Sequence, residues 1–323
     1  MTFDIVVSII NYKTPDLTQT CAESALAALD GHDGHVVIVD NASGDGSVET
    51  LSAWVDTHPQ KARMTFVASP QNTGFSGGHN IGIGTHQATH YLILNSDALL
   101  ARDFFDVLMP VVAAHPESGF FAPRIDTEEG NAQASCFRFH SPTSEFVRAA
   151  CTGFVTKALS RSVVSLGPDP DPSHIDWASG ACILFRGAMV EEIGPMDEGY
   201  FLYYEDAEYG LRGRRAGWGL TYVPEARAVH FRGGSGPVKT LAAQKKRMPP
   251  YYYASRTRFL YQAHGRLGLL AANLGWIAGR GVGQIRWLAG KPPHKMAAHE
   301  GRDIWINFTR PLGPRLAPWE SQK

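Results

Sequence analysis

Cysteine is scarce in this chain, and no two cysteines lie close together in the sequence. The four are Cys21, Cys136, Cys151 and Cys182. Their spacing matches neither a paired zinc-binding motif nor the dense disulfide framework of a small secreted domain. The simpler expectation is a reducing, cytoplasmic compartment.

Long hydrophobic runs are also absent. The N-terminal residues MTFDIVVSIINY have no basic segment before their apolar run, which argues against a signal peptide. The most apolar late stretch, Leu267–Gly279, is followed by Arg280 and is shorter than the roughly 20 residues that cross a bilayer. We therefore expect no transmembrane helix.

The chain has almost no net charge, with a formal value of -1 at pH 7. This balance argues against bulk electrostatic binding to nucleic acid. The charge is unevenly distributed, because residues 239–323 carry 15 Lys and Arg but only three Asp and Glu. A basic C-terminal region therefore follows an acidic body. At 323 residues the chain is long enough for two domains, or for one large domain with an appendage.

Short β-branched runs alternate with helical patterns over the first hundred residues. The expected strands are Ile5–Ile10, Val36–Asp40, Met64–Ala68 and Tyr91–Asn95, and the expected helices are Asp16–Leu29 and Ser47–Thr57. The strands are almost continuously apolar, as buried parallel strands are. This alternation predicts an open α/β sheet that binds its ligand at the carboxyl ends of the strands.

Polar residues follow two of these strands. Asp40 and Asn41 end the second, and Asn95, Ser96 and Asp97 follow the fourth. A carboxylate at such a position can accept the N–H of a pyrimidine base or bind a divalent cation such as Mg²⁺ or Mn²⁺. The alternative is that Asp40 caps the next turn and that Asp97 caps a helix over Ala98–Val112.

The segment from Gly74 to Gly84, GFSGGHNIGIG, lacks the spacing of a dinucleotide-binding fingerprint. Gly74, Gly77 and Gly78 could let the backbone approach a sugar nucleotide closely, with polar contacts from Asn72 and Asn80. A purely structural turn is the alternative.

An acidic cluster is embedded in aromatic residues later in the chain, in the order Tyr203, Tyr204, Glu205, Asp206 and, two residues on, Glu208. Apolar surroundings can hold one of these carboxylates as a general base. Acidic residues also favour the first turn of a helix, and the run AEYGLRGRRAGW has a helical pattern. The two interpretations are compatible.

Four ordered blocks resemble the inverting family 2 glycosyltransferases, in particular their rhamnosyltransferase and galactofuranosyltransferase branch. They are VVSIINYKTPDLT, VVIVDNASGDGS, QNTGFSGGHNIGI with YLILNSDALL, and the stretch from Trp177 to Phe231. The resemblance runs from Ile5 to about Tyr261. It implies a GT-A fold over residues 1–238, with a nucleotide-binding half of about 1–100, an acceptor half of about 101–238, and a basic helical region at 239–323.

The resemblance also assigns site residues. The nucleotide-sugar set is Asn11, Tyr12, Asp40, Asn41, Asn72, Gly74, Phe75, Asn80, Asn95, Ser96 and Asp97. Asp97, in the position of the DXD motif, and His230, after VPEARAV, are the implied metal ligands, and the following RGGSG is the implied closing loop. Asp206 is the implied base, supported by Glu205. Trp177 and Gly180 lie where relatives bind acceptor, although Trp177 could equally be a core residue.

The implied reaction is inverting, metal-dependent transfer of rhamnose from dTDP-rhamnose to a glycan or lipid-linked acceptor in cell-surface polysaccharide synthesis. The alternatives are a UDP-sugar-dependent hexosyl or galactofuranosyl transferase, or a nucleotide-sugar-binding protein without activity. The Arg residues of the C-terminal region interleave with apolar ones, which suits helices on the inner face of an anionic membrane. Helices packed on the catalytic domain, or on a second subunit in a homo-oligomer, are the alternative.

Overall fold

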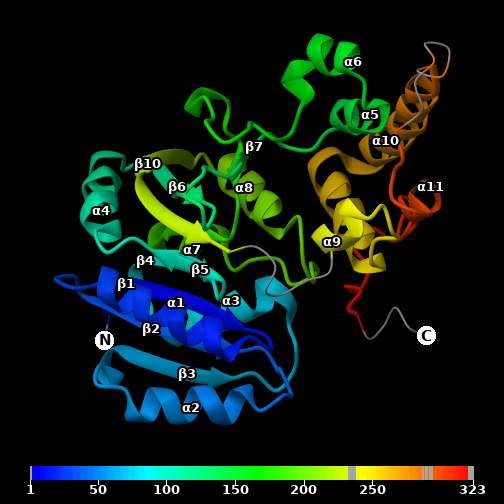
Figure 1. Ribbon diagram of the computed structural model, residues 1–323. Helices are drawn as coiled ribbons and strands as arrows, with labels where there is room; N and C mark the ends of the chain where they lie inside the picture. Colours follow the sequence, from blue (N-terminus) through cyan, green and yellow to red (C-terminus); the bar gives the residue numbers. More distant parts are fainter. Residues whose placement is uncertain (1, 232–237, 286, 288–289, 291–293, 319–323) are drawn as a thin grey trace.

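The computed structural model describes residues 2–231, 238–285, 287, 290 and 294–318 (Figure 1). Its centre is an eight-stranded sheet in the order β3-β2-β1-β4-β9-β6-β10-β5. The strands are β1 (Thr2–Asn11), β2 (Gly34–Asp40), β3 (Met64–Ala68), β4 (Gln87–Asn95), β5 (Ala98–Leu100), β6 (Ser118–Asp126), β9 (Cys182–Arg186) and β10 (Gly219–His230). β1 to β4 are mutually parallel, and β9 lies antiparallel between β4 and β6.

Helices cover both faces of this sheet. One face packs against α1 (Pro15–Ala28), α2 (Ser47–Thr57) and α4 (Phe104–Ala114). The other packs against α3 (Gly74–Thr85), α7 (Gly187–Ile193) and α8 (Glu205–Arg215). Because both faces are covered, the central strands are apolar on both sides. The expected mainly parallel sheet flanked by helices is confirmed.

Two local expectations are wrong. The predicted helix over Ala98–Val112 begins only at Phe104, because residues 98–100 form β5 and pair antiparallel with β10. Asp97 therefore caps no helix. The structural turn considered as the alternative for the segment from Gly74 is instead helix α3, whose glycines let it pack closely on β1. A Cβ at Gly78 would lie 2.8 Å from Ile10, and one at Gly82 would lie 2.1 Å from Ser8.

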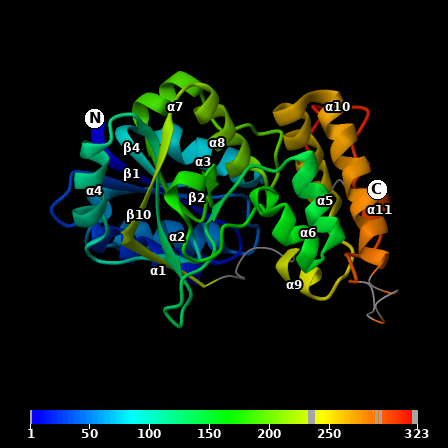
Figure 2. The same ribbon diagram turned by 90° about the horizontal axis from the view of Figure 1, so that it is seen from above.

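The remaining elements form a second layer beside the sheet. They are β7 (Cys136–Phe137), β8 (Trp177–Ala178), α5 (Pro142–Ala150), α6 (Gly153–Ala158), α9 (Val238–Ala243), α10 (Pro250–Gln284), α11 (Glu300–Asp303) and two short 3-10 helices at Ser160–Ser162 and Pro172–His174. A third 3-10 helix, Lys61–Arg63, lies at the sheet between α2 and β3. Figure 2 shows α5 alongside α10, with the sheet to one side. Among the described residues, no helix combines the length and hydropathy needed to cross a membrane.

Candidate active site at the carboxyl edge of the sheet

The ends of β1 and β2 meet in a buried hydrogen-bond network. Asn11 donates through Nδ2 to Asp40 Oδ2 at 2.7 Å, and Ser43 donates to Asp40 through both its backbone N–H and its hydroxyl. Asp40 is fully buried. Asp40 therefore caps the turn that follows β2, by accepting these bonds from Ser43. Its Oδ1 accepts the Ser43 N–H at 3.0 Å.

The neighbouring residues also serve the protein itself. Asn41 accepts from the Thr73 backbone and donates to the Gly74 carbonyl, so it ties the end of β2 to the start of α3. Asn72 accepts the Gly74 N–H. Asn80 lies further along α3 and bonds to the backbone of Met196, away from the strand-end network.

The end of β4 faces the end of β10. His230 Nε2 lies 3.0 Å from Asp97 Oδ1 and 3.5 Å from Asn95 Nδ2. The antiparallel pairing of β5 with β10 holds them together, because His230 is in register with Ala98. Ser96 is buried and bonds to the Thr14 hydroxyl. Tyr12 is half-buried at the end of β1, beside Lys13.

The acidic pair lies at the start of α8. Tyr203 and Tyr204 precede it with φ values of 71° and 70°, a left-handed conformation that is costly for bulky residues. Glu208 is bound by Arg212 at 3.0 Å through an i,i+4 ion pair. Glu205 and Asp206 have no such cationic partner among the described residues, which leaves them as the candidates for proton transfer.

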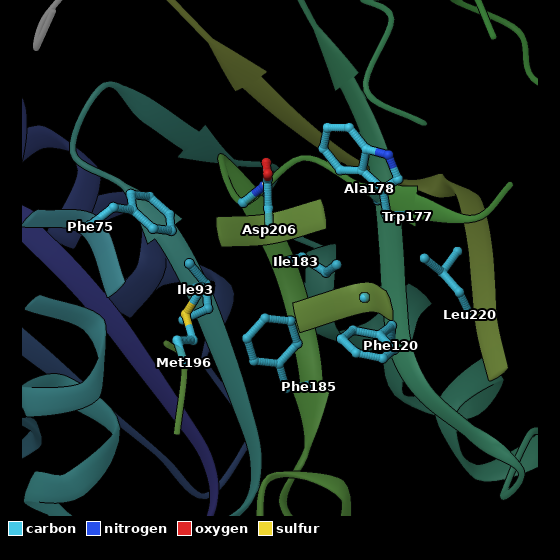
Figure 3. A pocket seen from close by; sticks show the side chains of 12 residues that line it. Phe75, Ile93, Phe120, Trp177, Ala178, Ile183, Phe185, Met196, Asp206 and Leu220 are labelled. Carbon is cyan, nitrogen blue, oxygen red and sulfur yellow. The ribbon is translucent and has the colours of Figure 1, made fainter. Parts of the chain in front are cut away.

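Asp206 is half-buried and adjoins an apolar hollow. Figure 3 shows its carboxyl group above the side chains of Phe120, Ile183 and Phe185. The hollow has a free volume of about 10 Å³, hardly room for one water molecule, so it desolvates the carboxylate and cannot hold a sugar. Burial raises the pKa of Asp206 to about 6, although the N–H groups of Ala207 and Gly180 donate to it.

Glu205 is more deeply buried than its neighbour. Burial, reinforced by the charge of Asp206, raises the pKa of Glu205 well above its usual range. Its Oε2 has no hydrogen-bond partner in the described structure. At neutral pH, Glu205 is therefore the protonated member of the pair and Asp206 the ionised one, which suits Asp206 as the base.

Backbone contacts bring the two acidic centres together. The Asn95 N–H donates to the Ala181 carbonyl, and the adjacent Gly180 N–H donates to Asp206 Oδ2 at 3.3 Å. A Cβ at Gly180 would lie 2.8 Å from the Phe75 ring, so only glycine fits there without movement. One short segment thus lies between the Asn95–Asp97 turn and Asp206.

Trp177 is buried in β8, stacks on Phe137 with ring centroids 4.4 Å apart, and donates through Nε1 to the Arg138 carbonyl. These contacts are those of a core residue. Near it lies His140, which sequence reasoning missed. Burial lowers the pKa of His140 to about 4, and its ring centroid is 4.8 Å from that of Tyr204.

Arg315 was also missed. Its guanidinium donates to the carbonyls of Thr73, at the start of α3, and of Glu198, in the loop that leads to the acidic pair. No local sequence pattern predicts this contact, because the two residues it joins, Arg315 and Thr73, are 242 residues apart.

Asp97 and His230 suit a divalent cation through their oxygen and nitrogen donors. Among the described residues, no cluster of three or more His, Cys, Asp or Glu side chains is present. A cation held by two side chains can also be bound by a diphosphate. The implied closing loop at residues 232–237 lies outside the described residues.

The sequence profile described as "Glycosyltransferase like family 2" matches residues 4–249. The chain belongs to this family. It is 26% identical over 256 residues to an N-acetylglucosaminyl-diphospho-decaprenol L-rhamnosyltransferase of Mycobacterium tuberculosis, covering 75% of this chain and 81% of that protein. It is also 26% identical over 237 residues to the low-salt glycan biosynthesis hexosyltransferase Agl10 of Haloferax volcanii, covering 70% and 67%.

Solved structures agree on the fold. The mannosyltransferase PcManGT of Pyrobaculum calidifontis, in complex with GDP-Man and Mn²⁺, aligns with a TM-score of 0.54 and 15% identity over 97% of this chain and 85% of that one. TarS residues 1–349 of S. aureus, in complex with UDP, align with a TM-score of 0.55 and 12% identity over 96% and 80%. The family 2 chain therefore has the GT-A fold and is a glycosyltransferase.

Proposed function

We propose that this glycosyltransferase inverts the anomeric centre and moves rhamnose from dTDP-rhamnose to a glycan or lipid-linked acceptor for cell-surface polysaccharide. The supporting observation is that two centres lie next to one another. Asp97 and His230 form the first, and Asp206 with its raised pKa forms the second. Gly180 and Ala181 connect them. The rhamnosyltransferase of M. tuberculosis supports the choice of sugar. A UDP-hexose or galactofuranose donor is the second candidate, favoured by the hexosyltransferase relative.

In the proposed reaction, Asp206 takes the proton of the acceptor hydroxyl as its oxygen attacks the anomeric carbon, and the bond to the nucleotide diphosphate breaks on the opposite side. Asp97 and His230 would hold a Mg²⁺ or Mn²⁺ ion. Such a cation stabilises the negative charge of the departing diphosphate. Glu205, being protonated, would donate a hydrogen bond to the acceptor or to Asp206. Asp40 would accept the base N–H, beside Asn11, Tyr12 and Asn41.

The division into a catalytic domain at residues 1–238 and a basic region at 239–323 belongs to the same proposal. The second region would bring the enzyme to the inner face of the cytoplasmic membrane, where a lipid-linked acceptor would be anchored. A non-catalytic nucleotide-sugar-binding role is disfavoured, since binding alone needs no carboxylate with a raised pKa at position 206.

We expect metal-dependent binding of nucleotide diphosphate to weaken by at least about tenfold in Asp97→Asn and in His230→Ala, because each variant loses a cation ligand. Asp40→Asn should weaken nucleotide binding with and without Mn²⁺. Calorimetric titration with dTDP and UDP measures both. Asp103→Asn, an exposed acid a few residues further on, is the matched control and should bind normally. Undiminished binding in Asp97→Asn and His230→Ala would overturn the metal assignment.

Transfer should depend on pH through Asp206. Because its pKa lies near 6, the base is ionised above pH 6, and kcat/KM should fall about tenfold per pH unit below it. Metal binding can also change with pH, so nucleotide affinity with Mn²⁺ is measured at each pH to separate binding from transfer. A flat profile down to pH 5, with metal binding intact, would show that Asp206 is not the base.

A further inference from the structure

The second half of α10 has two opposite faces. Gly265 interrupts the helix with a φ of 69°, and the helix then continues to Gln284. Its inner face packs backbone to backbone on α5: a Cβ at Gly275, Gly279 or Gly283 would lie 3.0 Å or less from a carbonyl oxygen of α5. Small residues at this four-residue spacing allow the two helices to approach closely.

The outer face is apolar and exposed. We call it the outer α10 face; its residues are Leu267, Ala271, Leu274, Ile277, Ala278 and Ile285. Leu267 is 83% exposed, and Leu274, Ile277 and Ile285 are each about half exposed. Spacings of 3, 4, 7 and 11 residues place these side chains on one side of a helix. Removing these apolar side chains from water would be favourable.

The charged residues within this half of the helix have one sign. They are Arg266 and Arg280, and the sequence contains no Asp or Glu between residues 226 and 299. An apolar face on a helix whose own charged residues are all arginines complements an anionic lipid surface.

We propose that the outer α10 face binds the surface of an anionic bilayer, lying in the plane of the membrane with its apolar side chains at the boundary of headgroups and acyl chains. The helix from residue 266 to 284 is about 28 Å long and would lie flat, since its opposite face is already occupied by α5. Binding through this face would present the active site to a membrane-anchored acceptor. That purpose rests on the proposed function, whereas the binding itself does not.

The competing proposal is that this face binds the same face of a second copy of the chain. Two such faces would bring the arginines of this helix close to those of a second copy, and like charges across an interface oppose association. The lipid surface supplies the missing negative charge. The observations therefore favour the membrane over the dimer.

The test is vesicle flotation of the full chain with Ala278→Glu and a matched control, Ala53→Glu. Both alanines are exposed and lie within helices, but Ala53 belongs to α2 at the far edge of the sheet. The unaltered chain and Ala53→Glu should float with phosphatidylglycerol-containing vesicles and not with phosphatidylcholine vesicles. Ala278→Glu should reduce the bound fraction by about tenfold, and raising the salt from 0.05 to 0.5 M should weaken binding, because screening shortens the reach of charge.

Equal flotation of both variants, or no flotation of the unaltered chain, would overturn the proposal. A dimer seen by sedimentation and abolished by Ala278→Glu, without vesicle binding, would assign the face to a second copy instead. Dissolved nucleotide diphosphate should bind normally to both variants. A failure of the membrane proposal is thereby kept separate from a failure of the proposed function.

Discussion

Asp206→Asn should lower the transfer rate by roughly two to four orders of magnitude, since it keeps the shape of the side chain and removes the base. The Gly180 and Ala207 N–H groups donate to different oxygens of the carboxylate, so the single amide oxygen keeps one of these two bonds. Donor and metal binding should therefore survive. The measurements are single-turnover transfer and calorimetric titration with the donor nucleotide.

Two variants sharpen this result. Glu205→Gln should slow transfer less, because a protonated Glu205 and a glutamine can both donate a hydrogen bond. Asp169→Asn, an exposed acid in the same half of the chain, should transfer at the normal rate. If Asp206→Asn kept near-normal turnover, the base would lie elsewhere, with Glu205 the next candidate.

Arg256→Met should lower the free energy of unfolding by about 3 to 5 kcal/mol, because it removes one of the two arginines that neutralise the buried carboxylate of Glu145. Arg256 binds Glu145 through Nε and Nη2, at 3.0 and 2.7 Å, and both side chains are 1% exposed. Burial alone would raise the pKa of Glu145, but Arg148 and Arg256 reverse the effect and hold it well below its usual range. Urea unfolding measures the change.

The matched control is Arg266→Met, which alters an exposed arginine of the same helix and should change the free energy of unfolding by no more than about 0.5 kcal/mol. The double variant Glu145→Leu with Arg256→Met should recover part of the loss, because it leaves no unpaired charge in the interior. Equal effects of Arg256→Met and Arg266→Met would contradict this account of how α10 is held on α5.

The sequence predicted the nucleotide-binding half of the fold well because its signals there are local. β3 and α2 have the predicted bounds, set by apolar runs and by a turn sequence that stops each element. β5 was missed because its three residues become a strand only by pairing with β10, about 130 residues away. α3 was missed because five glycines in twelve residues disfavour a helix, and packing on β1 overrides that propensity.

The candidate site shows the same division. Strand ends predicted that Asp40 and Asp97 lie at one edge of the sheet, and the acidic run predicted a helix starting near Glu205. The left-handed conformation of Tyr203 and Tyr204 and the apolar hollow at Asp206 depend on distant segments. Neither leaves a local pattern. The sequence therefore identified the carboxylates, while the structure supplied the cause of the raised pKa of Asp206.

The central claim is inverting transfer in which Asp206 acts as the base, and the anomeric configuration of the product tests it most directly. The enzyme, Mn²⁺, the donor and an acceptor glycan are combined, and the configuration of the new linkage is determined by NMR from the coupling at the anomeric carbon. The account predicts a configuration opposite to that of the donor, because a single displacement inverts the centre. A product that retained the donor configuration would contradict it, even if Asp206 proved essential.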